Sequence, residues 1–152
     1  MASTKKGQNL FIAACIAIAF FTCGTVTYGQ NGPAFKDYKG VVLGMSAADV
    51  RQKLGKAEDQ SDTEDYWEFD GEETARILYD AKKNVRAISI NYNAPNDATP
   101  TAQKIFGEKI DPKPDGSVYK MMEYPKEGFW ISYVRTAGET PLVIVTIQKR
   151  DT

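Results

Sequence analysis

The sequence contains no histidine, and its two cysteines, Cys15 and Cys23, both lie near the N-terminus. The first absence removes the commonest general base, the usual partner of a serine or cysteine nucleophile and the commonest transition-metal ligand. Because both cysteines lie near the N-terminus, the rest of the chain has no disulfide and no thiolate zinc site. No glycine-rich phosphate loop and no G-x-S-x-G nucleophile elbow occurs. We therefore expect a protein that is not an enzyme and that holds no cofactor or metal.

An excess of charge of one sign is also missing, since the formal net charge is −1. A nucleic-acid-binding protein is usually basic, with Lys and Arg clustered on one face, so we expect no nucleic-acid partner. Hydrophobic residues make up 42% and charged residues 26% of the 152 positions. That composition is typical of a globular chain, and the chain is long enough to bury a core without disulfides or metals.

The sequence has one long apolar run, near its start. This uninterrupted run is Leu10–Phe21, and it is preceded by Lys5 and Lys6. Positive, then apolar, then small and polar residues are typical of a secretory signal peptide. The run is shorter than the roughly 20 apolar residues of a membrane span. We predict a signal peptide over residues 1–29, with cleavage after Gly29, and a periplasmic or secreted product.

Cys23 leaves two alternatives open for this segment. Lipidation at Cys23 would anchor the protein in the outer membrane, although Thr22 is bulky for the position before a lipidated cysteine. A retained signal would instead act as a membrane anchor. We expect a membrane association only if one of these two alternatives holds.

Residues 30–38 lack periodicity and are predicted to form a linker. The clearest helix signal follows at Ser46–Leu54. Ser46 is a good N-cap with Asp49 three residues later, as in a capping box. Val50 and Leu54 lie on one helical face, and Gly55 suits the left-handed position that ends a helix.

Short strands with alternating apolar residues are predicted on both sides of a second helix. Thr99 is predicted to cap that helix, with Pro100 at its first position and Gly107 after its end. The predicted strands are Asp65–Asp70, Thr74–Tyr79 and Val85–Tyr92 before it, and Val118–Tyr124, Phe129–Val134 and Leu142–Lys149 after it.

The order helix–strand–strand–strand thus occurs twice, over residues 39–94 and 95–152. The two segments align thinly: Glu68-Phe69 with Glu123-Tyr124, Ile77 with Ile131, and Ile88-Ser89-Ile90 with Val145-Thr146-Ile147. Short turns favour antiparallel strands. We predict one compact α+β domain built from two tandem repeats, with an antiparallel sheet and both helices on one face.

Alternation within the strands separates a core face from an opposite, open face. The predicted core residues are Trp67, Phe69, Ile77, Tyr79, Ile88, Ile90, Met122, Tyr124, Ile131, Tyr133, Val145 and Ile147. The predicted open face carries Tyr66, Glu68, Arg76, Leu78, Met121, Trp130, Ser132, Leu142, Ile144 and Thr146. Among these, Tyr66, Arg76, Met121 and Trp130 are our candidates for contact with a protein partner, because large side chains of these kinds anchor interfaces.

Three other interpretations of the open face remain. The Tyr38–Leu43 segment or the other repeat covers it, or the strand register is shifted by one residue, which would exchange the two faces.

An acidic stretch is predicted to be a solvated loop rather than a calcium site, because its spacing does not match an EF-hand loop. It comprises Glu58, Asp59, Asp62, Glu64 and Asp65. A hydrolase that uses two carboxylates stays a less favoured alternative.

The segment Gly44–Gly55 reads G-M-S-A-A-D-V-R-Q-K-L-G. It resembles the G-M-(S/T)-x-x-(D/E)-V-x-x-x-L-G opening of the SmpA/OmlA family, which includes an outer-membrane assembly lipoprotein. The doubled layout resembles the β-lactamase inhibitor protein. These resemblances imply binding rather than catalysis. We therefore predict an exported, non-enzymatic binding protein of the cell envelope with a protein partner. The alternatives are an outer-membrane assembly lipoprotein and an inhibitor of an exported enzyme.

Overall fold

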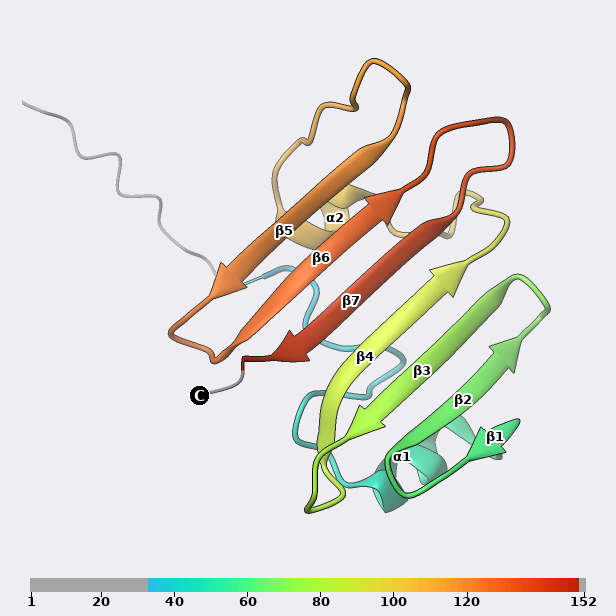
Figure 1. The fold of residues 1–152 in the computed structure, drawn as a ribbon, viewed down its shortest axis with the longest axis vertical. Coiled ribbons are helices and arrows are strands. Elements are labelled where there is room, and N and C mark those ends of the chain that lie inside the picture. Colours follow the sequence, from blue (N-terminus) through green and yellow to red (C-terminus); the bar gives the residue numbers. More distant parts are fainter. Residues whose placement is uncertain (1–32, 151–152) are drawn as a thin grey trace, which may run out of the picture.

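The computed structural model describes residues 33–150, and these residues form an α+β fold (Figure 1). The helices are α1 (Ala47–Leu54) and α2 (Ala102–Phe106). The strands are β1 (Asp59–Gln60), β2 (Glu64–Phe69), β3 (Glu73–Tyr79), β4 (Val85–Tyr92), β5 (Val118–Tyr124), β6 (Phe129–Arg135) and β7 (Val143–Lys149). They form one open antiparallel sheet in the order β1-β2-β3-β4-β7-β6-β5.

The strand order follows from short connections. Short connections of three to seven residues join β2, β3 and β4 in sequence, and likewise β5, β6 and β7, and each makes its neighbours antiparallel. In the turn after β2, Asp70 and Gly71 both have positive φ, at 52° and 68°. Those are backbone angles that Asp tolerates and Gly adopts freely. Strands β4 and β7 then pair at the centre of the sheet.

Helix α1 begins and ends where the sequence predicts. The Ser46 hydroxyl accepts a hydrogen bond from the Asp49 amide at 3.2 Å and donates one to the Asp49 carboxylate at 2.7 Å. Gly55 has a φ of 79°, and its N–H donates to the Arg51 carbonyl. Val50 is fully buried, so the helix is fixed on the sheet by its apolar side.

The predicted start of the second helix is wrong by two residues. The N-cap of α2 is Thr101, whose hydroxyl accepts from the Lys104 amide at 3.3 Å. The Thr99 hydroxyl instead accepts from the Asn96 amide at 3.0 Å, within the preceding turn. A side chain already used by a turn cannot also cap a helix, and Pro100 therefore lies before the cap.

The predicted core face is confirmed by the burial of its side chains. Ten of the twelve predicted core residues are buried, and the remaining two, Phe69 and Met122, are half-buried and pack against the same cluster. The register explains this, because Ile77, Ile88 and Ile147 lie opposite one another across three strands. No one-residue register shift has occurred, so the two faces are assigned correctly.

The segment before α1 packs on the core face and does not cover the open face. Tyr38 and Val41 form a β-bridge, and both are buried in the core cluster. The Tyr38 ring meets Phe69 edge-on at a centroid distance of 6.3 Å. The interpretation in which residues 38–43 cover the open face is therefore wrong, and Tyr38, the last residue of the predicted linker, belongs to the core.

The predicted signal peptide over residues 1–29 and the candidate lipidation site Cys23 lie outside the described residues. Between residues 33 and 150, no helix has the length and apolar character needed to cross a membrane.

Candidate functional site

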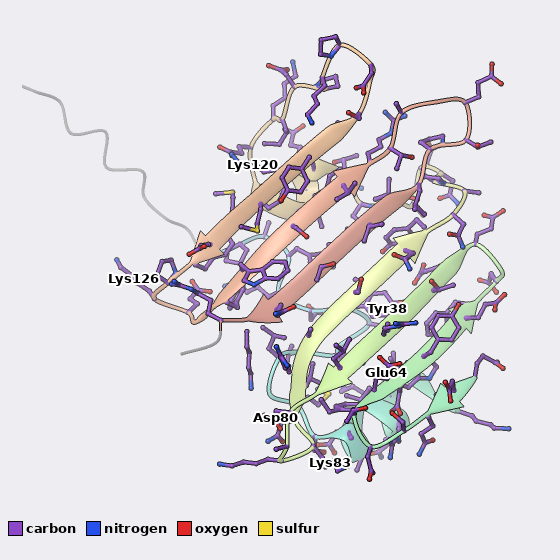
Figure 2. The ribbon with its side chains drawn as sticks, viewed as in Figure 1. Tyr38, Glu64, Asp80, Lys83, Lys120 and Lys126 are labelled. Atoms are coloured by element: carbon purple, nitrogen blue, oxygen red, sulfur yellow. The ribbon has the colours of Figure 1, made fainter. Side chains whose placement is uncertain are left out.

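The open face, the side of the sheet opposite the core cluster, is crossed by rows of side chains that the strand register defines. The middle row consists of Tyr66, Arg76, Ser89, Thr146, Ser132 and Met121, one from each of six neighbouring strands. Figure 2 looks onto this face, and no described helix or loop crosses in front of the strands. Side chains from six strands are therefore displayed together to solvent.

All four predicted contact residues lie on the open face, but the structure does not bring them into one cluster. Tyr66 and Arg76 are cross-strand neighbours on β2 and β3. Met121 lies on β5 and Trp130 on β6, beyond β4 and β7. Because adjacent strands are about 4.8 Å apart, Arg76 lies about 14 Å from the β6 position in its row. The face therefore has two separate groups of large side chains.

The β5–β6 side of the face holds the more exposed apolar side chains. Met121 is 46% exposed, while Trp130 is half-buried between Glu123 of β5 and Gln148 of β7. Tyr119, two residues from Met121 on the same strand and face, is 56% exposed. Our sequence interpretation missed Tyr119, although strand alternation from Met121 would have placed it there.

The opposite side of the face is charged. Arg76 lies 3.9 Å from the Glu64 carboxylate, and both side chains are well exposed. Figure 2 shows Glu64 on β2 at this side of the sheet. An ion pair this long and exposed contributes little to stability, so the Arg76 side chain is free to re-pair with a partner.

Ser89 and Asn91 of β4 and Thr146 of β7 place uncharged polar side chains between the two groups. The Ser89 and Thr146 hydroxyls lie 3.3 Å apart, and the Asn91 amide donates to the Thr74 hydroxyl at 3.3 Å. These groups donate and accept hydrogen bonds without the cost of desolvating a charge. The open face thus combines exposed apolar, charged and hydrogen-bonding side chains, which are the kinds of side chain found in protein interfaces.

Part of the acidic stretch is buried, which corrects the expectation of a wholly solvated loop. The Asp65 side chain is fully buried, and Arg51 donates to both of its oxygens at 2.8 and 3.0 Å. The Tyr79 hydroxyl donates to the same carboxylate at 2.7 Å. Alternation along β2 points Asp65 inward, and the guanidinium from α1 compensates for its burial.

This network also shifts the proton affinities of its members. The hydrogen bond to Asp65 raises the pKa of the Arg51 guanidinium. Burial, followed by the hydrogen bond to Asp65, raises the pKa of the Tyr79 hydroxyl. Each proton therefore stays in place at neutral pH, and the network acts as a structural unit.

A second polar group lies at the end of the β2–β3 hairpin. The Tyr38 hydroxyl donates to the Glu73 carboxylate, and the Lys39 ammonium lies 3.2 Å from the same oxygen. A cavity of about 240 Å³ adjoins it, lined by Asp70, Glu72, Glu73, Tyr92, Ala94, Asn96, Ala98 and Thr99. Across residues 33–150, no group of three or more carboxylates, cysteines or histidines is placed to hold a metal ion.

We expect the protein to lose stability in alkali because several of its tyrosines are buried. Burial raises the pKa of Tyr92 to about 12, and burial also raises the pKa of Tyr38 and of Tyr79. In the unfolded chain a tyrosine has a pKa of about 10. The folded state therefore holds protons that the unfolded state releases, and this stabilisation is complete below pH 10 and is lost as the pH rises through about 12.

Tyrosinate absorbance and circular dichroism, recorded together against pH, check this expectation. The buried tyrosines should ionise only as the fold is lost, and Tyr92→Phe should move the alkaline transition to higher pH. Full ionisation of every tyrosine with an intact fold would contradict it.

Comparisons of the chain with protein-family models, with curated proteins and with solved structures found no match. The resemblance of Gly44–Gly55 to the SmpA/OmlA opening, and of the layout to the β-lactamase inhibitor protein, stays a prediction.

Proposed function

We propose that this chain is an exported, non-enzymatic binding protein of the cell envelope that contacts a protein partner through its open face. The observation that carries the proposal is the middle row of that face. It places Tyr66 and Arg76 at one end and Met121 at the other, with hydroxyl groups between them. Tyr, Trp, Met and Arg are the side chains that protein interfaces favour.

The distribution of these groups supports a macromolecular partner rather than a small molecule. The two groups of large side chains lie on opposite sides of a strip two strands wide, so one ligand touching both must span about 14 Å or more. A small-molecule site is usually a concave pocket with convergent polar groups. A sheet face presented by six strands instead offers the broad, nearly continuous surface of a protein interface.

We further propose that the described fold is a tandem duplication related by a twofold axis at the centre of the sheet. Ser89 and Thr146 pair directly across β4 and β7, so an axis through them maps Ile88 onto Val145 and Ile90 onto Ile147. The same axis maps Phe69 onto Tyr124. Both relations agree with the alignment of the two sequence segments.

One pair in that alignment needs a two-residue shift. Ile77 pairs with Ile88, while Tyr133, and not Ile131, pairs with Val145. The central axis therefore relates Ile77 to Tyr133. The shift keeps both residues on the core face because alternation has a period of two.

The proposal also assigns both helices to the core face. The Trp67 indole donates to the Gly55 carbonyl at the end of α1, at 3.2 Å. Ile105 and Phe106 of α2 belong to the same buried cluster as Tyr124 of β5. In Figure 1 both helices are drawn behind the strands. This arrangement leaves the reverse side of the sheet to a partner.

Trp130→Ala tests the proposal. In crosslinking and pull-down from the native compartment, we expect the variant to bind a captured partner roughly thirtyfold more weakly, a loss of about 2 kcal/mol. The free energy of unfolding should change by less than about 1 kcal/mol, because Trp130 is outside the core cluster. Gln103→Ala, at an exposed position of α2, is the matched control and should leave binding unchanged. Unchanged capture by the Trp130 variant, or a large loss of stability, would refute the assignment of Trp130 to the interface.

The identity of the captured protein separates the two alternatives. Capture of outer-membrane assembly components, together with a lipid on Cys23 in mass spectrometry of the N-terminus, indicates the assembly lipoprotein. Capture and inhibition of an exported enzyme indicates an inhibitor.

A further inference from the structure

The two edges of the sheet are protected very differently. One edge is the two-residue strand β1, and the other is β5, which is seven residues long and has no strand beside it within residues 33–150. An edge strand presents unpaired N–H and C=O groups, and proteins usually shorten or cover it. Strand β5 is thus the longer edge available for pairing.

The backbone of β5 has a definite outward pattern. In the turn after β5, the Gly128 N–H donates to the Tyr124 carbonyl at 2.9 Å, so the backbone of Tyr124 faces β6. Hydrogen-bonding groups alternate along an antiparallel strand. Tyr119, Met121 and Glu123 therefore direct their N–H and C=O groups away from the sheet. No backbone hydrogen bond from the described loops reaches these three residues.

The exposed side chains coincide with this outward backbone. Tyr119 and Met121 are two of the three large hydrophobic residues that are clearly exposed within residues 33–150. Apolar side chains next to unpaired backbone groups are what a neighbouring strand would cover.

We propose that β5 pairs antiparallel with β5 of a second copy of this chain, about a twofold axis at Met121. In this register Met121 lies opposite the second copy's Met121, Tyr119 opposite its Glu123, Lys120 opposite its Met122 and Val118 opposite its Tyr124. All seven residues of the strand are paired. Three of the pairs join outward-facing residues on both copies, which allows about six backbone hydrogen bonds.

Among the registers with a twofold axis between Lys120 and Glu123, the charges of β5 and the following Pro125 favour this one. Such an axis keeps each side chain on its own face, so the register changes only in steps of two residues. An axis at Lys120 or at Glu123 would place like charges directly opposite each other. An axis at Met122 would place Tyr119 opposite Pro125, which has no N–H to donate.

The same residues favour a second copy over an unrelated strand. Every position of β5 finds an acceptable partner in β5 itself, and the Lys120 charge is already compensated by Glu108 of the same chain at 3.2 Å. The pairing would continue the sheet across the axis and join the two open faces side by side. It goes beyond the proposed function, because it concerns the edge of the sheet and self-association rather than the partner on its face.

Sedimentation equilibrium of the purified full chain, over a range of concentrations, tests the pairing. We expect a species of twice the protomer mass, and we expect its complete loss in Met121→Pro. The proline removes the N–H at the axis and places a ring against the second copy, while the Met121 N–H makes no bond to β6. Circular dichroism establishes that the variant is folded.

A cysteine pair tests the register independently of any effect of proline on folding. In a chain with Cys15 and Cys23 replaced by serine, Met121→Cys lies opposite itself, at a Cα separation of about 5.5 Å that a disulfide can span. Tyr119→Cys is the matched control, since its own copy lies four residues away along the strand. Oxidation should cross-link the first variant and not the second. A protomer mass at every concentration, a dimer that survives Met121→Pro in folded form, or equal cross-linking of both cysteine variants would overturn the proposal.

Discussion

Arg51→Met should lower the free energy of unfolding by about 3 kcal/mol or more, the largest single effect we expect from a charged residue in this protein. The reason is the asymmetry of its ion pair with Asp65. The Asp65 side chain is fully buried, whereas the Arg51 side chain is 33% exposed. Without the guanidinium, a buried carboxylate keeps only the Tyr79 hydroxyl as a donor. If Asp65 were replaced instead, the partly exposed Arg51 side chain would turn toward water.

The double variant Arg51→Met/Asp65→Asn separates this explanation from a simple loss of packing. Asparagine removes the charge and can still accept from Tyr79, so the double variant should be more stable than Arg51→Met alone. Chemical denaturation of both variants gives the comparison. Lys53→Met is the matched control: Lys53 is exposed on the same helix, has no ion pair among the described residues, and should cost less than about 0.5 kcal/mol. Equal losses in the single and double variants would show that the buried charge is not the cause.

Trp67→Ala should cost about 4 kcal/mol, because it removes the largest buried side chain of the core face. Trp67 is 2% exposed, lies on β2 and hydrogen-bonds to the carbonyl that follows α1. The variant loses the burial of an indole ring and leaves a cavity between the sheet and that helix. Trp67→Phe keeps most of the volume and loses the hydrogen bond, so it should cost about 1–3 kcal/mol.

The contrast between the two tryptophans makes this prediction specific. Thermal and denaturant unfolding of Trp67→Ala and Trp130→Ala should give a large loss for the first and a small one for the second. Similar losses would mean that the two faces of the sheet are equally buried, and the assignment of the open face would fail with it.

Local chemistry determined most of the secondary structure. A capping serine, a four-residue apolar spacing and a terminal glycine suffice to delimit α1, since each acts within one or two turns. Alternation gave the strands and their inner face because its period of two is a property of the strand itself. The same reasoning failed at α2, where Thr99 and Thr101 are both plausible caps and only the turn around Asn96 decides between them.

Features that depend on contacts between distant segments could not be predicted without the tertiary structure. Strand β1 is only two residues long and carries no alternation that could reveal it. Asp65 belongs to an acidic stretch that looks solvated in the sequence. Its burial is explained by the hydrogen bond from Arg51, which lies fourteen residues earlier in the chain. The open-face residues Tyr66, Arg76, Met121 and Trp130 were selected correctly by face but without knowledge of their separation across β4 and β7.

By itself, the sequence determined which residue types are absent, where most of the helices and strands lie, and which side of each strand is apolar. These depend on residue types and on spacings of a few residues. Only the tertiary structure decided that β4 and β7 meet at the centre, that Tyr38 packs into the core, and that β5 is left at an edge. Those arrangements depend on the burial of one continuous core. Its free energy comes from contacts between residues that are far apart in the sequence, so no short segment determines it.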